Sequence, residues 1–156
     1  MLELITLATA GRRRTSGSGF GILRAMRTLK PRRILVIDDK HDQAESFARL
    51  LEALGHQAEF VTMPQEALAV ARRFRPQLVC VDIGMPLVNG YELARMFRAE
   101  FGYESMRIVA VTAYGGDEYR VRSRQAGFDA HLVKPASIES VESMLATVWD
   151  PAEPNY

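Results

Sequence analysis

The sequence contains one cysteine, Cys80, among its 156 residues, so no disulfide can form within the chain. No apolar run approaches the roughly 18 to 20 residues that a membrane-spanning helix requires. Positive charges follow the apolar stretch 1–10, whereas a secretory signal carries them before its apolar core. These absences predict a cytoplasmic protein with no membrane span, in which Cys80 is a plain buried thiol.

A clustered Cys/His metal site is also absent, because His41, His56 and His131 are scattered along the chain. This spacing excludes the usual zinc sites. The net charge is only +1, but it is unevenly distributed. Residues 1–33 hold eight Lys or Arg residues and one acidic residue, while the remainder holds twelve basic and eighteen acidic residues.

A basic segment of this kind could contact nucleic acid or anionic lipid. However, Phe20 is the only aromatic residue there that could stack on a base. We therefore interpret residues 1–31, which are rich in Arg, Gly and Ser, as a solvated, flexible leader containing a short helix over 22–29. Residues 32–149 are expected to form one folded domain, followed by a short tail over 150–156. We expect no nucleic-acid binding through that domain.

Short apolar runs alternate with amphipathic stretches from residue 32 onward. Strands are predicted over 34–37, 58–61, 78–81, 108–111 and 130–133. Helices are predicted over 42–54, 64–74, 91–100, 117–126 and 137–149. This alternation is typical of an α/β fold in which helices cover both faces of a parallel sheet.

Four of the predicted strands end on residues that phosphoryl chemistry can use. Asp38 and Asp39 follow the first strand and Asp82 follows the third, while Thr112 and Lys134 end the fourth and fifth. Parallel strands gather their carboxyl ends at one edge of a sheet, where ligands bind. We therefore expect these side chains to share one crevice.

Three carboxylates in one crevice would repel one another. Two like charges about 4 Å apart cost roughly 4 kcal/mol at an effective dielectric constant near 20. Either one carboxylate is protonated or a divalent cation lies among them. Oxygen ligands in an open, partly hydrated site favour Mg²⁺ over Zn²⁺.

A carboxylate beside Mg²⁺ is a known type of phosphoryl acceptor. The transferring group carries negative charge on its equatorial oxygens, so catalysis consists mainly of positioning and counter-charge. The cation, the Lys134 ammonium and the Thr112 hydroxyl could each bind one of these oxygens.

The residues around these strand ends resemble the receiver domain of two-component response regulators. The combination is specific: an acid pair, then an acid followed by Met-Pro and Asn-Gly, then a threonine, then Lys-Pro. It covers about residues 32–149, and the matching stretches are 34–42, 81–94, 108–116 and 126–137. The last of these also looks like receivers attached to hybrid sensor histidine kinases.

The resemblance implies a (βα)₅ flavodoxin-like sheet with strand order 2-1-3-4-5. It implies that Asp82 is the phosphoacceptor and that Thr112 and Lys134 contact the phosphoryl group. Mg²⁺ would be held by Asp38, Asp39 and Asp82 with the backbone carbonyl of Gly84. A cis bond between Lys134 and Pro135 is expected as well.

The resemblance also implies a conformational switch, in which Thr112 acts with a residue three positions before the lysine. That residue is commonly Tyr or Phe and is His131 here. We expect the phosphoryl group to come from a histidine kinase or a histidine phosphotransfer protein. No DNA-binding or catalytic output domain is expected, so the signal should pass to an unknown downstream protein, with phosphorylation-dependent dimerisation left open. The only enzymatic activity expected is self-phosphorylation and self-dephosphorylation.

Two alternatives place the chain in other classes. A haloacid dehalogenase-type hydrolase also forms an aspartyl phosphate, but it needs Asp-x-Asp after the first strand and a further acidic pair beyond the lysine. Here the first strand is followed by Asp38-Asp39-Lys40. The glycines of 17–21 suggest a nucleotide-binding loop, but they do not have the dinucleotide-binding spacing and no strand precedes them. They also faintly resemble the ATP-lid box of histidine kinases, but the rest of that ATP-binding domain is missing.

Overall fold

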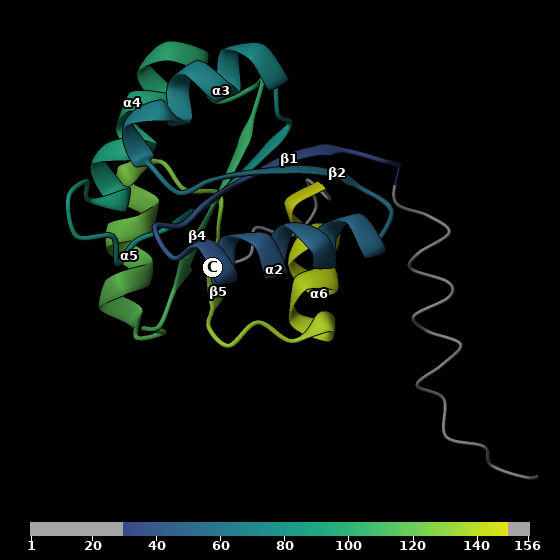
Figure 1. Ribbon diagram of the computed structural model, residues 1–156. Coiled ribbons are helices and arrows are strands. Elements are labelled where there is room, and N and C mark those ends of the chain that lie inside the picture. The colour runs from purple at the N-terminus through teal and green to yellow at the C-terminus, as the bar shows by residue number, and fades with distance from the viewer. Residues whose placement is uncertain (1–29, 150–156) are drawn as a thin grey trace, which may run out of the picture.

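The computed structural model describes residues 30–149, which form an open sheet covered by helices on both faces (Figure 1). The strands are β1 (Arg33–Ile37), β2 (Gln57–Val61), β3 (Leu78–Asp82), β4 (Arg107–Thr112) and β5 (Ala130–Val133). The helices are α2 (His41–Ala53), α3 (Ala67–Phe74), α4 (Gly90–Phe101), α5 (Asp117–Ala126) and α6 (Ile138–Trp149), with a 3₁₀ turn, η1 (Pro64–Glu66), before α3.

All strand pairs are parallel, and the strand order is β2-β1-β3-β4-β5. This confirms the predicted doubly wound fold and its order. The order reverses between β1 and β3, which are direct neighbours although α2, β2 and α3 separate them in the sequence. The carboxyl ends of these two strands therefore flank the switch point at which such folds bind ligands.

Alternate residues of each central strand enter two separate cores. In β1, Leu35 and Ile37 pack on the side of α3, α4 and α5, whereas Ile34 and Val36 pack on the side of α2 and α6. The period of two in side-chain direction explains why the central strands are apolar throughout. Cys80 belongs to the second core, and burial raises the pKa of its thiol to about 12, as expected for an unreactive structural residue.

The boundaries of the strands and helices differ from the predicted ones by at most one residue, except at the start of α3. The predicted helix over 64–74 begins with η1, in which the amide of Glu66 donates to the carbonyl of Met63 at 2.9 Å. This three-residue spacing is the tighter 3₁₀ hydrogen bond, and the α-helix starts only at Ala67.

Ser137 caps α6 as predicted, because its Oγ accepts a hydrogen bond from the amide of Ser140 at 3.1 Å. The leader, its short helix and the tail lie outside the described residues. None of the helices within 30–149 is long and apolar enough to cross a membrane.

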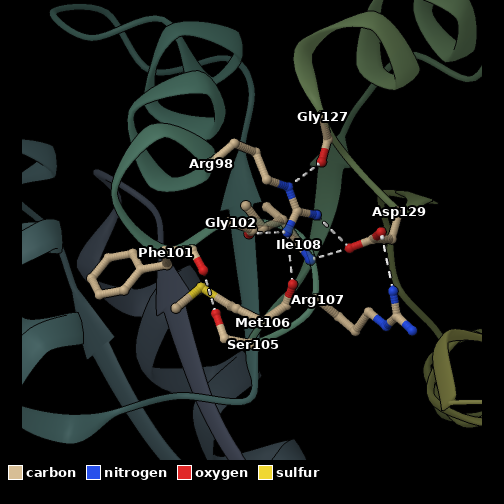
Figure 2. A network of polar contacts seen from close by, with 9 residues as sticks. All are labelled: Arg98, Phe101, Gly102, Ser105, Met106, Arg107, Ile108, Gly127 and Asp129. Atoms are coloured by element: carbon tan, nitrogen blue, oxygen red, sulfur yellow. Dashed lines mark hydrogen bonds and ion pairs between the residues drawn. The ribbon is translucent and has the colours of Figure 1, made fainter.

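A buried arginine forms a network of hydrogen bonds at the edge of the sheet opposite the strand-end acids (Figure 2). Arg98, on α4, donates from Nε to the carbonyl of Gly127 at 2.8 Å and from Nη1 to those of Gly102 and Met106 at 3.0 and 2.7 Å. Its Nη2 lies 2.6 Å from Oδ2 of Asp129. One side chain thus joins the loops that follow α4 and α5.

Asp129 extends this network into the sheet. Its Oδ2 also accepts a hydrogen bond from the amide of Ile108, at the start of β4, at 2.7 Å. Gly127 permits the close approach, because its φ is +100° and a Cβ there would lie 2.8 Å from Cγ of Arg98. The helices α4 and α5 are therefore fixed at one end by a charged, hydrogen-bonded cluster.

Replacing Arg98 with leucine should lower the free energy of unfolding by about 2 to 4 kcal/mol, since it leaves Asp129 and three carbonyls without their donor. Urea denaturation monitored by circular dichroism measures the change. The matched control is Arg72→Leu, which removes a bidentate but exposed pair with Glu100. Equal effects of the two substitutions would contradict the assigned role of the network.

Candidate functional site

The three strand-end carboxylates meet at the carboxyl edge of β1 and β3. Asp38, Asp39 and Asp82 each offer an oxygen, and these oxygens all lie within 4.8 Å of one another. Asp38 and Asp82 are buried, at 4% and 7% exposure. Residues 44 positions apart in the sequence are thus brought together by the crossover between two adjacent parallel strands.

Asp82 is positioned by the loop that follows it. Its Oδ1 accepts a hydrogen bond from the amide of Gly84 at 3.0 Å. The N-cap residue Asn89 accepts from the amide of Tyr91 at 2.9 Å and so starts α4. Gly90 lets this helix start against the strand end, because a Cβ there would lie 2.8 Å from the carbonyl oxygen of Asp82.

Among residues 30–149, Lys134 has the only cationic side chain that contacts the clustered carboxylates. Its Nζ lies 2.9 Å from Oδ2 of Asp38 and 3.4 Å from Oδ2 of Asp82. It also donates to Oε1 of Gln43 at 2.9 Å. The peptide bond between Lys134 and Pro135 is cis. Gln43 was not singled out from the sequence; its place in the first turn of α2, directly after the acid pair, is the signal that could have found it.

Thr112 ends β4 beside this cluster and is buried. Its carbonyl accepts the backbone amide of Lys134 at 2.8 Å, so the two residues lie on adjacent strands at the same edge. Its Oγ1 accepts a hydrogen bond from the amide of Tyr114 at 3.1 Å. The Thr112 hydroxyl therefore stabilises the turn with which the β4–α5 loop begins, beside the site.

His131 contacts the same loop from β5. Its Nε2 lies 2.9 Å from the carbonyl oxygen of Tyr114, and its Nδ1 lies 3.3 Å from Oγ of Ser123 on α5. A carbonyl only accepts, so Nε2 carries the proton and donates. Thr112 and His131 thus both hold Tyr114, one through its amide and the other through its carbonyl.

The acid cluster fits a divalent cation. Three carboxylates face one ammonium, which leaves an excess of negative charge if all are ionised. Oδ1 of Asp39 is buried without a hydrogen-bond partner, although such atoms normally have one. An oxygen-only donor set around an unsatisfied carboxylate suits Mg²⁺. No other group of three potential metal ligands occurs among the described residues.

Comparison with known proteins matches residues 34–146 to the response regulator receiver domain family. The chain belongs to this family. It is 33% identical over 121 residues to the polar-differentiation response regulator DivK of Brucella anthropi, covering 74% of this chain and 97% of that protein. The receiver thus spans nearly the whole of this curated relative.

Solved structures give the same result. The chemotaxis response regulator CheY4 of Vibrio cholerae has a TM-score of 0.71 and 25% identity, covering 76% of this chain and 99% of that one. A CheY-like receiver domain from Methylobacillus flagellatus has a TM-score of 0.67 and 29% identity, with coverage of 76% and 99%. The chain is therefore a two-component signalling receiver in both sequence and fold.

Mg²⁺ binding to the receiver should weaken at least tenfold in an Asp39→Asn variant, because the substitution removes a charged ligand and leaves an amide in its place. Isothermal titration calorimetry with MgCl₂ measures the affinity. Asp42→Asn is the matched control, since Asp42 is a neighbouring aspartate whose side chain is fully exposed on α2. Equal losses in both variants would mean that Mg²⁺ responds only to overall charge.

The stability of the receiver should depend on pH through His131. Burial lowers the pKa of this imidazole below its ordinary 6.5; the hydrogen bond to the Tyr114 carbonyl raises it by a smaller amount, and the charge of Arg120 lowers it further. The unfolded chain therefore takes up the proton first as the pH falls. The stabilisation is complete above pH 6.5 and is lost as the pH falls from 6.5 through the lower folded-state pKa.

A His131→Phe variant should lose less stability than the wild-type chain between pH 7.5 and pH 5.5, as measured by urea denaturation at each pH. Some dependence should persist, because burial also lowers the pKa of His56, with Arg32 contributing. An unchanged pH dependence in the variant would show that His131 does not titrate differently in the two states.

Proposed function

We propose that this receiver accepts a phosphoryl group on Asp82 from a phosphohistidine of a kinase or a phosphotransfer protein, with Mg²⁺ bound at the acid cluster. The observation that carries the proposal is the convergence of three carboxylates and one ammonium at a single sheet edge. Asp38 and Asp39 would hold the cation together with Asp82 and the carbonyl of Gly84.

The reaction needs little covalent chemistry from the protein. A carboxylate oxygen of Asp82 attacks phosphorus, the bond between phosphorus and the donor nitrogen breaks, and the nitrogen takes up a proton. Oδ1 of Asp82 is held by the Gly84 amide, whereas Oδ2 faces the ammonium of Lys134. The cation supplies counter-charge to the phosphoryl oxygens, and Lys134 and Thr112 contribute a charge and a hydroxyl.

The output is a change in the β4–α5 loop and α5. Moving the Thr112 hydroxyl toward a phosphoryl oxygen would cost its hydrogen bond with the amide of Tyr114. Of the two hydrogen bonds to Tyr114, the one from His131 to its carbonyl would then remain. The phosphoryl group can shift the equilibrium between the two loop positions only by the difference in its interaction free energy with each of them.

The surface that would report this change carries exposed apolar side chains. Tyr114 is 60% exposed and stacks on Tyr119 of α5, with ring centroids 5.1 Å apart, and Val121 is 52% exposed. These side chains move with the loop and the helix. A downstream protein that binds this surface would therefore distinguish the two states.

A haloacid dehalogenase-type hydrolase is the alternative enzyme function. It needs further acids beyond the lysine at the metal site. Among the described residues the group of potential ligands contains only Asp38, Asp39 and Asp82, while Glu139 and Glu142 lie on α6. The alternative predicts multiple turnover of p-nitrophenyl phosphate, whereas the receiver should form and hydrolyse only its own acyl phosphate.

Asp82→Asn should abolish labelling by ³²P-acetyl phosphate in the presence of Mg²⁺, because an amide cannot form the acyl phosphate. Phosphate-affinity gel electrophoresis of the wild-type and variant chains gives the readout. Asp117→Asn, at the first residue of α5, is the control and should be labelled like the wild type. Persistent, acid-stable labelling of the Asp82 variant would overturn the assignment of the phosphoacceptor.

A further inference from the structure

Gln43 is a polar side chain at the site that has no role in the chemistry given above. It lies in the first turn of α2, and its Oε1 accepts a hydrogen bond from Nζ of Lys134 at 2.9 Å. The two residues are 91 positions apart in the sequence. The contact joins the helix that follows the acid pair to the loop that follows β5.

The ammonium of Lys134 is shared among three oxygens. Asp38 Oδ2 and Gln43 Oε1 each accept at 2.9 Å, whereas Asp82 Oδ2 lies at 3.4 Å, an ion-pair distance without a hydrogen bond. Because Asp82 Oδ1 already accepts from the Gly84 amide, Oδ2 is the carboxylate oxygen that hydrogen bonds leave free. The uncharged Gln43 amide thus holds the Lys134 ammonium toward α2 and away from Oδ2 of Asp82.

Packing does not fix Lys134 in this position. A hollow of about 450 Å³ lies beneath α2 and beside the β5–α6 loop, and Gln43, Ser46, Phe47 and Lys134 are among the residues that line it. The ammonium therefore has room to move. Its position depends on the acceptors around it, of which Gln43 is the only uncharged one within residues 30–149.

We propose that Gln43 is a positioning residue that holds the Lys134 ammonium beside Oδ2 of Asp82 without a hydrogen bond to it. The inference deepens the proposed function and rests on Asp82 being the phosphoacceptor. Without Gln43 the ammonium would be drawn onto the two carboxylates, and a hydrogen bond to Oδ2 would make that oxygen a weaker nucleophile. Because the Gln43 amide is uncharged, it holds the ammonium without adding a negative charge that would repel the incoming phosphoryl group.

The test compares phosphorylation rates of full-length Gln43→Leu and wild-type chains over a range of acetyl phosphate concentrations at saturating Mg²⁺. The maximal rate should fall roughly fivefold, with the half-saturating donor concentration within twofold of the wild type, because the amide acts on the nucleophile and not on donor binding. The control is Ser46→Ala, one turn along α2 and lining the same hollow, which should match the wild type. Both substituted side chains are exposed, so the fold is expected to survive, which circular dichroism confirms.

A double-mutant cycle with Lys134→Ala separates positioning from a general effect on α2. If Gln43 acts only through Lys134, adding Gln43→Leu to Lys134→Ala should change the rate by less than about twofold. A fivefold loss that persists without the lysine would overturn the inference, and so would a Gln43→Leu chain that reacts like the wild type. Absence of label at Asp82 in the wild-type chain would instead refute the proposed function itself.

Discussion

The repulsion among Asp38, Asp39 and Asp82 is the constraint on which the rest of the site depends. Three carboxylate oxygens within 4.8 Å of one another are tolerated in the folded chain only with compensating charge. Lys134 supplies part of it, and its contacts with Asp38 and Asp82 link β5 to β1 and β3. Under the proposed function, the uncompensated negative charge would bind a divalent cation, and that cation would in turn bind the phosphoryl group. At this edge of the sheet, the negative charge that would bind a cation also destabilises the folded chain.

The opposite edge of the sheet is built on a different principle. Arg98 donates to three carbonyls and to Asp129, so its charge is compensated within the fold. This difference divides α5 into two parts. Its C-terminal end is fixed at Gly127, whereas its N-terminal end follows the β4–α5 loop held by Thr112 and His131. Motion that starts at the phosphoryl site is thus expected to turn α5 about its far end.

The sheet and the acid cluster could be predicted from the sequence because both follow from local patterns. The unbroken apolar runs predict buried parallel strands. The polar residues at the ends of these runs predict the site, because parallel strands bring their carboxyl ends together at one edge of the sheet. Arg98 could not be predicted, because nothing in an amphipathic helix distinguishes a buried arginine from an exposed one until the loops around Gly102 and Gly127 are placed. Gln43 was missed for a similar reason: its partner is 91 residues away, and the pairing depends on which face of α2 turns toward β5.

His131 departs from the family pattern at the position of the proposed switch residue, and this departure would change how the switch works. A Tyr or Phe at this position would act through packing, whereas the imidazole holds the Tyr114 carbonyl by a directional hydrogen bond. An intramolecular hydrogen bond contributes about 1 kcal/mol, which is roughly a fivefold change in an equilibrium constant. Because Thr112 holds the amide of the same residue, Tyr114 would lose one of these two hydrogen bonds if the hydroxyl turned to a phosphoryl oxygen. The remaining hydrogen bond would oppose release of the loop, so under the proposed function phosphorylation would have to supply more differential binding here than in a receiver whose switch residue lacks this bond.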